Sequence, residues 1–458
     1  MSQLLTAAAG KRVLLLNPPV AEMLDGPEGL ASALNPPFGL LRLATWLRGR
    51  GNEVTLLDAT SDPLLQGQPR RHVRRRVRCG DDGEAPVDRE VWHLGLDGAQ
   101  LERRLAESSP DLIAIGATFT WHEPILAEVV AACRRVHPRA RVVLGGNLPT
   151  LCPVEARRAG ADETVRGAIQ DASFSPTAID LVQGPIREDW LRLVKGCPHR
   201  CSYCVTPALN GGQVLARQPE EVLAEMKAKV ALQGVRRFAF HDDAVLYRRG
   251  RHVEPLLDLV AQERLGVALD FATGIAASQV DEALVRRFAA AGVEVVRLAL
   301  ETIDPVRARA MNRPQGRDQF VRAVEILRAH GYTGQRLRAF YLVGLPDQTT
   351  DDILEAVLWL YGLGVTPHLT TYTLTPGSED HASYRSRVAG YSLDELAPLA
   401  WRFAHPGMKV RELDACVRYF SQRFIPPERL LGSVTDDPLV VRMQALARRL
   451  GRAQAGRT

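Results

Sequence analysis

The stretch KGCPHRCSYCVTP, residues 195–207, brings three cysteines within eight positions in the spacing C-x3-C-x2-C. Thiolates this close together are metal ligands. A tetrahedral zinc site would be one ligand short. Three thiolates suffice for three irons of a [4Fe–4S] cube, and the fourth iron is then left without a protein ligand. The stretch predicts a metal centre at Cys197, Cys201 and Cys204, and it favours an iron–sulfur cluster over structural zinc.

The composition of the 458-residue chain supports thiols kept reduced for metal binding. Seven cysteines are an odd number and only three of them cluster, which argues against a disulfide framework. Hydrophobic residues make up 46% and charged residues 24%, as in ordinary globular proteins. No apolar run reaches the roughly 18 residues of a membrane span, and the first residues lack the order of a secretory signal. We therefore expect a cytoplasmic protein without a membrane span.

A run of basic residues, RRHVRRRVR at 70–78, raises the question of nucleic-acid binding. No aromatic residues are interleaved with these arginines to stack on bases. The net charge of +5 is also small for this length. We favour a solvated loop, and nucleic acid is not an expected partner.

Short apolar strands alternate with helical patterns over the first 165 or so residues. Examples are VLLLNPP (13–19), DLIAIGATFT (111–120) and RVVLGGNLPT (141–150). Continuous apolar strands separated by helices indicate a doubly wound parallel sheet, a Rossmann-like domain that we place at residues 1–170. Residues 61–100 interrupt the alternation with a polar insertion that is either disordered or a surface excursion.

The alternation resumes after a linker at residues 171–185. Six strand–helix units follow within residues 186–390, and the first strand, in DWLRLVKG, leads into the cysteine stretch. Six units are fewer than the eight of a closed barrel, which predicts a partial (β/α)6 barrel. Residues 391–458 are helical and rich in arginine, and we expect a C-terminal cap there. The fold class is α/β.

The cysteine stretch, placed after the first strand of a partial barrel, resembles the radical S-adenosylmethionine (SAM) superfamily over about residues 186–380. In that family three cysteines hold a [4Fe–4S] cluster, and the amino and carboxylate groups of SAM bind the open iron. The resemblance implies that electron transfer from the reduced cluster cleaves SAM to a 5′-deoxyadenosyl radical. It also implies an external electron donor of the flavodoxin or ferredoxin type.

Other strand ends match the same family. They are HDD (241–243), LALET (298–302), AFYLVGLPDQT (339–349) and LTPGS (374–378), with Asp347 in place of the usual glycine. HDD would also serve as a helix N-cap, and Glu301 as a paired surface carboxylate. The resemblance implies SAM contacts from Tyr203, Asp242, Asp243, Thr273, Glu301, Val343, Gly344 and Thr375.

The first domain resembles the cobalamin-binding domain that precedes the barrel in one large radical SAM subclass. This resemblance rests on P-P-x-G-L at 36–40, L-x-D at 56–58 and V-x-L-G-G-x-x-P-T at 142–150. An open parallel sheet binds ligands at the carboxyl ends of its strands. The implied cobalamin contacts are Asn17, Pro18, Phe38, Thr118, Phe119, Trp121, His122, Gly145, Gly146, Pro149, Thr150 and Gly167.

The chain departs from these cobalamin patterns in two ways. It contains no D-x-H-x-x-G, which argues against a histidine-ligated cobalt, and the common R-G-E-x-E appears as RGAIQ (166–170) without either carboxylate. Trp121 and His122 fall in the loop expected under the corrin, where their bulk would exclude a lower axial ligand. The pair would equally serve as packing residues.

The two resemblances together imply a cobalamin-dependent radical SAM enzyme that methylates an unactivated carbon of a small-molecule or peptide natural-product intermediate. The methyl group would come from methylcobalamin. The alternative is a radical SAM isomerase, cyclase or ring-rearranging enzyme, with or without functional cobalamin. An RNA-modifying methylthiotransferase is less favoured, because such enzymes normally carry three more clustered cysteines in the first domain. Here Cys79, Cys133 and Cys152 are scattered.

Overall fold

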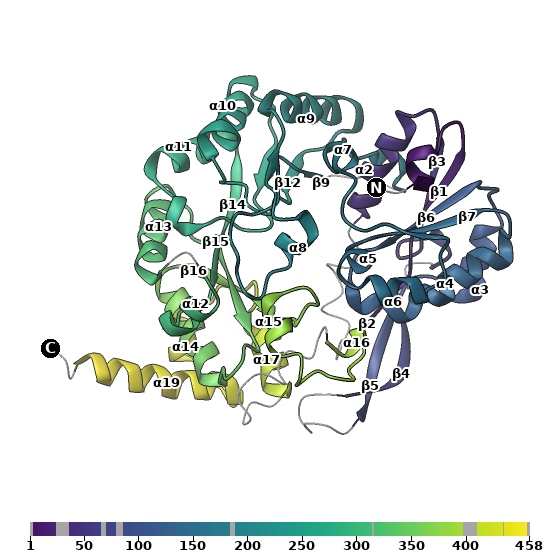
Figure 1. The fold of residues 1–458 in the computed structure, drawn as a ribbon. Coiled ribbons are helices and arrows are strands. Elements are labelled where there is room, and N and C mark those ends of the chain that lie inside the picture. Colours follow the sequence, from purple (N-terminus) through teal and green to yellow (C-terminus); the bar gives the residue numbers. More distant parts are fainter. Residues whose placement is uncertain are drawn as a thin grey trace.

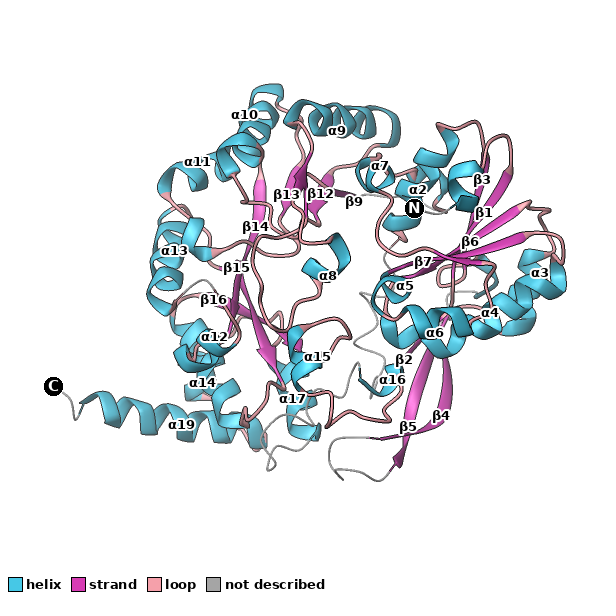
Figure 2. Ribbon diagram, viewed as in Figure 1, coloured by secondary structure: helices cyan, strands magenta, loops and turns pink. Residues whose placement is uncertain are grey.

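The computed structural model of the chain describes residues 3–23, 36–65, 70–78, 86–183, 188–313, 316–396, 410–433 and 435–455. Two α/β units lie side by side, and helices follow at the C-terminal end (Figures 1 and 2). This arrangement confirms the predicted fold class.

The first unit is a five-stranded parallel sheet in the order β3-β1-β6-β7-β8. Its central strands are apolar throughout because separate hydrophobic cores cover both faces of the sheet. The strands are β1 (Arg12–Asn17), β3 (Glu53–Asp58), β6 (Leu112–Ala117), β7 (Arg141–Gly146) and β8 (Glu163–Thr164). The helices are α1 (Gln3–Ala7), α2 (Phe38–Arg48), α3 (Gly98–Leu105), α4 (Glu123–Val136), α5 (Asn147–Leu151), α6 (Pro153–Arg158) and α7 (Gln170–Phe174), with 3-10 turns η2 (Pro63–Leu65), η4 (Thr120–His122) and η5 (Ile179–Leu181).

The insertion predicted at residues 61–100 contains a second, smaller sheet. Strand β4 (Arg70–Arg78) pairs antiparallel with β5 (Pro86–Leu94), which in turn pairs with β2 (Val20–Met23). This hairpin extends away from the first parallel sheet (Figure 1). The basic run is therefore a strand rather than the favoured loop.

The second unit is a six-stranded parallel sheet in the order β16-β15-β14-β13-β12-β9, which confirms the partial barrel. Its strands are β9 (Glu188–Leu191), β12 (Arg237–Phe240), β13 (Ala268–Asp270), β14 (Val293–Glu301), β15 (Gly334–Val343) and β16 (Val365–Thr371). Two short strands, β10 (Val194–Lys195) and β11 (Leu215–Ala216), pair outside this sheet. The helices and 3-10 turns are α8 (Thr206–Asn210), α9 (Pro219–Gln233), η6 (Arg249–Arg251), α10 (Val253–Glu263), η7 (Ala277–Gln279), α11 (Glu282–Ala291), α12 (Pro305–Ala310), α13 (Arg317–Ala329) and α14 (Thr350–Gly362).

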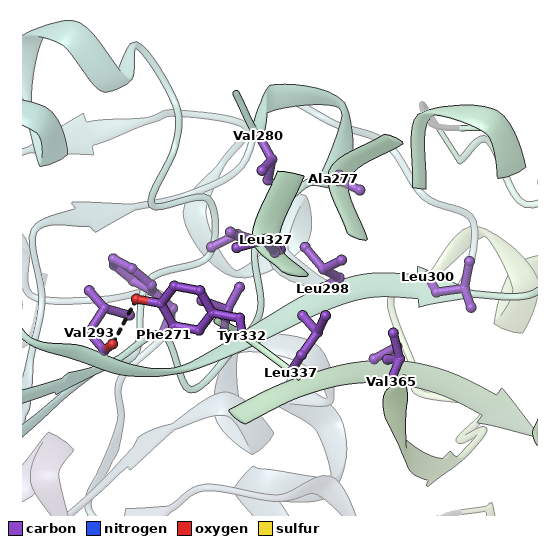
Figure 3. Packing of buried hydrophobic residues seen from close by; sticks show 14 of the residues in the cluster. Phe271, Ala277, Val280, Val293, Leu298, Leu300, Leu327, Tyr332, Leu337 and Val365 are labelled. Carbon is purple, nitrogen blue, oxygen red and sulfur yellow. Dashed lines mark hydrogen bonds between the residues drawn. The ribbon is translucent and has the colours of Figure 1, made fainter. Parts of the chain in front are cut away.

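The largest hydrophobic core lies between the barrel strands and the helices that surround them. Leu298, Leu337 and Val365 project from neighbouring strands toward Leu327 of α13 (Figure 3). The buried Tyr332 satisfies its hydroxyl by donating to the Val293 carbonyl at 2.8 Å. These contacts fix the strands whose carboxyl ends carry the predicted site.

The described parts of the C-terminal region are mainly helical, as predicted. The helices are α15 (Glu379–Ser383), α16 (Leu393–Leu396), α17 (Val410–Phe420), α18 (Pro427–Gly432) and α19 (Pro438–Ala455). Across the described parts of the chain, no helix combines the length and apolar character needed to cross a bilayer.

The two units meet through an aromatic stack. Trp190 of β9 lies between Phe38 of α2 and His241, with ring centroids 4.0 Å and 3.3 Å away. The buried Arg42 of α2 donates to the carbonyl oxygens of Trp190 at 2.7 Å and Ser175 at 2.6 Å. These contacts tie helix α2 of the first unit to the first strand, β9, of the second.

A network of buried charges lies beside this stack. Lys229 of α9 pairs with Asp189 of β9 and with Glu225, the latter at 2.9 Å. Glu225 also accepts from Arg217 at 2.5 Å, and Thr177 donates to Asp189 at 2.9 Å. Buried carboxylates are tolerated only with such compensation.

Replacing Lys229 should therefore destabilise the protein strongly. Lys229→Met leaves Asp189 buried without its cation, and we expect the free energy of unfolding to fall by about 3–5 kcal/mol. The matched control is Lys227→Met on the same helix, because Lys227 pairs with Glu263 at 2.8 Å at the surface, where the two side chains are 48% and 39% exposed. An exposed pair contributes at most about 1 kcal/mol. Equal losses for the two variants in urea denaturation would contradict this account.

His241 should make stability depend on pH. Burial lowers its pKa from 6.5 to about 3, so below pH 6.5 the unfolded chain takes up a proton that the folded chain refuses. Stability is then lost as the pH falls from 6.5 toward 3. We expect the free energy of unfolding of His241→Phe, which keeps a ring against Trp190, to fall by about 1.6 kcal/mol less than that of the wild type between pH 6.5 and pH 5. Parallel stability curves for the two proteins would show that His241 is not the titrating group.

Candidate functional site

The cysteine loop begins where β9 ends, at the carboxyl edge of the barrel. The sequence predicted one strand through Gly196, but the chain leaves the sheet after Leu191 and β10 pairs with β11 instead. Gly196 makes the turn with φ 90°, and any side chain there would overlap the Gln213 carbonyl oxygen. Only glycine fits this position.

Two carboxylates after β12 hold the start of the loop. Asp242 accepts from the backbone amides of Leu193, at 2.9 Å, and Val194. Asp243 accepts from the amide of Gly196 at 2.7 Å. Burial raises the pKa of Asp242 to about 7, and its second oxygen is buried without a partner among the described residues. Asp243 is exposed and can take a further cationic partner.

Two later segments of the barrel hold the middle of the loop. The amide of Ser202 donates to the carbonyl of Met311 at 3.2 Å, and the amide of Asp380 donates to the carbonyl of Ser202 at 2.9 Å. Segments following β14 and β16 therefore fix the backbone between the second and third cysteines.

The three thiols form one group. Cys201 is buried, and Cys197 and Cys204 are half-buried. Burial raises the pKa of Cys197 to about 11, and the nearby thiols of Cys204 and Cys201 add to this shift. Such thiols become thiolates when they bind a metal. In the described parts of the chain, no three His, Cys, Asp or Glu side chains converge as ligands of one ion. A [4Fe–4S] cube instead places each thiolate on its own iron, and the loop fits that arrangement.

Arg313 reaches this loop, although no sequence pattern predicted that it would. Its Nη1 donates to Cys201 Sγ at 3.6 Å and to the Tyr203 hydroxyl at 3.2 Å. Its Nη2 donates to the carbonyl of Ala299 at 3.1 Å and lies 3.9 Å from the Glu301 carboxylate. Burial raises the pKa of both Tyr203 and Glu301. Asn312 signals a turn before Arg313, but no spacing links this arginine to the cysteines.

The other residues expected to bind SAM also follow the barrel strands. Glu301 ends β14 with φ 67°, and the Thr273 hydroxyl donates to the Asp242 carbonyl at 2.6 Å. Gly344 follows β15, whose last residue is Val343, with φ 82°. The Thr375 hydroxyl lies 3.4 Å from the carbonyl of Thr373, beyond β16.

A buried glutamine shapes the loop after β15. Gln348 accepts from the amides of Gly344, at 2.7 Å, and Leu345, at 3.2 Å, and donates to the Leu342 carbonyl at 3.1 Å. It thereby satisfies backbone groups at the end of a buried strand. Gln348 lies within the AFYLVGLPDQT segment, but nothing in the sequence pattern predicts this role for it.

The carboxyl edge of the first sheet carries a compact set of hydrogen bonds. Asn17, at the end of β1, donates to Asp58 at the end of β3 at 2.8 Å, and the Thr60 hydroxyl donates to the same oxygen at 2.7 Å. Asp58 belongs to the L-x-D pattern but was not among the predicted contacts. These hydrogen bonds hold the ends of the adjacent strands β1 and β3 together.

Glycines open the neighbouring part of the same edge. Gly146 has φ 116°, and a side chain there would overlap the Ala117 carbonyl. The Thr150 hydroxyl donates to the Gly146 carbonyl at 2.8 Å and accepts from the Gly167 amide at 2.9 Å. With Gly145 beside them, these residues present backbone rather than side chains, which fits the approach of a large planar ligand.

The remaining first-domain residues lie in varied surroundings. Phe38 belongs to the stack with Trp190 and to the barrel core. His122 is only 3% exposed, and burial lowers its pKa to about 3, so its imidazole is neutral. Phe119 meets it edge-on at 5.1 Å between ring centroids. The side chain of Trp121 lies outside those described. Pro18 and Pro149 are buried, and Thr118 is exposed.

The cysteine loop and the glycine-rich edge face each other. Helix α8, which follows the third cysteine, lies on the side of the barrel nearest α5, which follows Gly146 (Figure 1). A Cβ placed on Gly377 would lie 3.0 Å from Leu151 of α5 and 3.7 Å from Ala208 of α8. The two predicted binding edges therefore meet at one junction.

Comparisons with known proteins agree with the division of the chain into two α/β units. The radical SAM superfamily model matches residues 191–360, and the B12 binding domain model matches residues 31–173. The chain is 29% identical over 206 residues to the ribosomal protein uS12 methylthiotransferase RimO of Desulfotalea psychrophila, covering 42% of this chain and 45% of that protein. It is 26% identical over 214 residues to the bacteriochlorophyllide d C-12(1)-methyltransferase of Chlorobaculum tepidum, covering 46% and 45%. The chain spans about half the length of these curated relatives.

Two solved structures share the fold. The radical SAM methyltransferase TsrM from Kitasatospora setae, with cobalamin and a [4Fe–4S] cluster bound, superposes with a TM-score of 0.63 at 17% identity, covering 98% of this chain and 100% of that one. The cobalamin-dependent radical enzyme OxsB, with aqua-cobalamin and SAM bound, superposes with a TM-score of 0.54 at 11% identity, covering 96% and 61%.

The chain thus joins a B12-binding domain to a radical SAM barrel. Its cofactors are a [4Fe–4S] cluster and SAM, which the radical SAM domain implies, and cobalamin, which the B12-binding domain implies.

Removing one loop cysteine should abolish cluster binding. Anaerobically reconstituted wild-type protein should carry about four iron atoms per chain, and Cys201→Ala should lose most of this iron and its visible absorbance. Cys416→Ala is the matched control, because Cys416 is buried in the barrel core among apolar residues. Iron retained by Cys201→Ala, or lost equally by both variants, would place the cluster elsewhere.

Proposed function

We propose that the protein transfers a methyl group to an unactivated carbon of a small-molecule or peptide natural-product intermediate. The observation that carries this proposal is the junction at which the cysteine loop faces the glycine-rich edge, because a substrate between them would reach both cofactors. The names of TsrM and of the Chlorobaculum relative describe methyltransferases, which supports the same reaction type.

The proposed cluster ligands are Cys197, Cys201 and Cys204. The SAM and cobalamin contacts are those expected from the sequence, and Arg313, Gln348 and Asp58 join them as supporting residues. When bound, the cofactors supply a 5′-deoxyadenosyl radical and a transferable methyl group. The domains divide at residues 1–170, 186–390 and 391–458, and the linker at 171–185 contains part of α7 and all of η5.

The residues of the chain bind and orient the reactants. Asp243 is exposed beside the loop and suits the ammonium group of SAM. Glu301 is oriented by Arg313 and suits a hydroxyl donor such as a ribose. The buried backbone around Gly344 offers an apolar surface that keeps water from the adenine.

A methylthiotransferase is the second candidate, because RimO is among the relatives. The buried thiols of the first domain argue against it. Burial raises the pKa of Cys133 and Cys152 to about 12, and both lie within the first core. Cys79 lies outside the described residues.

Product analysis separates the candidates. We expect mass spectrometry of turnover mixtures, with an external low-potential electron donor of the flavodoxin type, to show S-adenosylhomocysteine and 5′-deoxyadenosine together. Both products should require a candidate substrate and cobalamin. 5′-Deoxyadenosine alone from cobalamin-loaded protein would indicate rearrangement or cyclisation, and a methylthio product would indicate the second candidate.

A further inference from the structure

Arg313 is a cation that contacts the cluster-binding loop directly, at Cys201 and Tyr203. Its side chain is 10% exposed, and its guanidinium lies 3.6 Å from Cys201 Sγ. Arginine remains charged under all ordinary conditions. A buried, permanent positive charge therefore adjoins a proposed cluster ligand.

The backbone holds this charge in place from several directions. Asp304 caps the start of α12, and Asn312 turns the chain after that helix with φ 53°. The Arg313 amide then donates to the carbonyl of Ala308 at 2.9 Å. Because Met311 accepts from the Ser202 amide at 3.2 Å, the segment that carries the arginine is bonded to the cysteine loop itself. The contact does not depend on a mobile surface side chain.

The charged groups near Arg313 do not form a close ion pair with it, so its guanidinium can interact with the cluster. In the described parts of the chain, Glu301 is the carboxylate within ion-pair distance of Arg313, and its 3.9 Å separation exceeds the 3.6 Å to Cys201 Sγ. The other partners, the Tyr203 hydroxyl and the Ala299 carbonyl, are neutral. Arg313 thus donates to sulfur without a close bidentate carboxylate.

We propose that Arg313 sets the reduction potential of the cluster by raising it through Cys201. A [4Fe–4S]2+ core with three thiolates carries a net charge of −1, and gain of one electron makes it −2. A fixed cation and an N–H donor at a ligand sulfur stabilise the more negative state. The electron comes from an external low-potential flavodoxin or ferredoxin, which is oxidised by one electron. The inference rests on the cluster placement proposed above.

The experiment is a redox titration of the reconstituted protein without SAM, monitored by the electron paramagnetic resonance signal of the reduced cluster. We expect Arg313→Gln to lower the equilibrium constant for reduction at least tenfold, which is about 59 mV for a one-electron couple. Arg313→Lys, which keeps the charge, should recover most of the wild-type midpoint. Arg309→Gln, an exposed arginine of α12, should leave the midpoint unchanged.

Iron content separates the possible failures. Should Arg313→Gln not retain iron, Arg313→Met fills the same buried space without an unsatisfied polar group and is titrated instead. A midpoint unchanged or raised in the neutral variant that retains iron would overturn the role of Arg313. Iron retained by Cys201→Ala would overturn the cluster placement itself.

Discussion

The site depends on the hydrogen bonds between the carboxylates after β12 and the start of the cysteine loop. Asp242 and Asp243 accept from the amides of Leu193, Val194 and Gly196, and these bonds hold the chain where it leaves the barrel sheet ahead of the cysteines. Asp242 and Asp243 were predicted as SAM contacts from their position. The structure shows that the two carboxylates also accept hydrogen bonds from the backbone of the cysteine loop and thereby shape it.

The second constraint is the junction of the two domains. The stack of Phe38, Trp190 and His241 and the hydrogen bond from Arg42 to the Trp190 carbonyl fasten α2 to the first barrel strand. With that end fixed, the carboxyl edges of the two sheets are directed toward one another at Gly377, where any side chain would press against Leu151. The structure thus brings the cofactor-binding edges of the two domains together, and this junction is where we propose that the substrate binds.

The sequence predicted the architecture well because its strands are continuous apolar runs and its cysteine spacing is specific. It placed six barrel strands and put Glu301 at the end of the fourth. It missed the hairpin strand at residues 70–78, whose two valines among arginines do not give the alternation typical of a strand. Arg313 and the stacking of Phe38 were also hidden, because both depend on partners far away in the chain. Contacts of that kind are set by packing rather than by local pattern.

The central claim is that the cysteine loop and the glycine-rich edge face each other at one junction, close enough for their two cofactors to act on one substrate. Pulsed electron paramagnetic resonance on protein loaded with a reduced cluster and cob(II)alamin tests this claim most directly. The account predicts dipolar coupling between the two spins, lost when Cys201→Ala removes the cluster. Two fully independent signals in protein that holds both cofactors would contradict it.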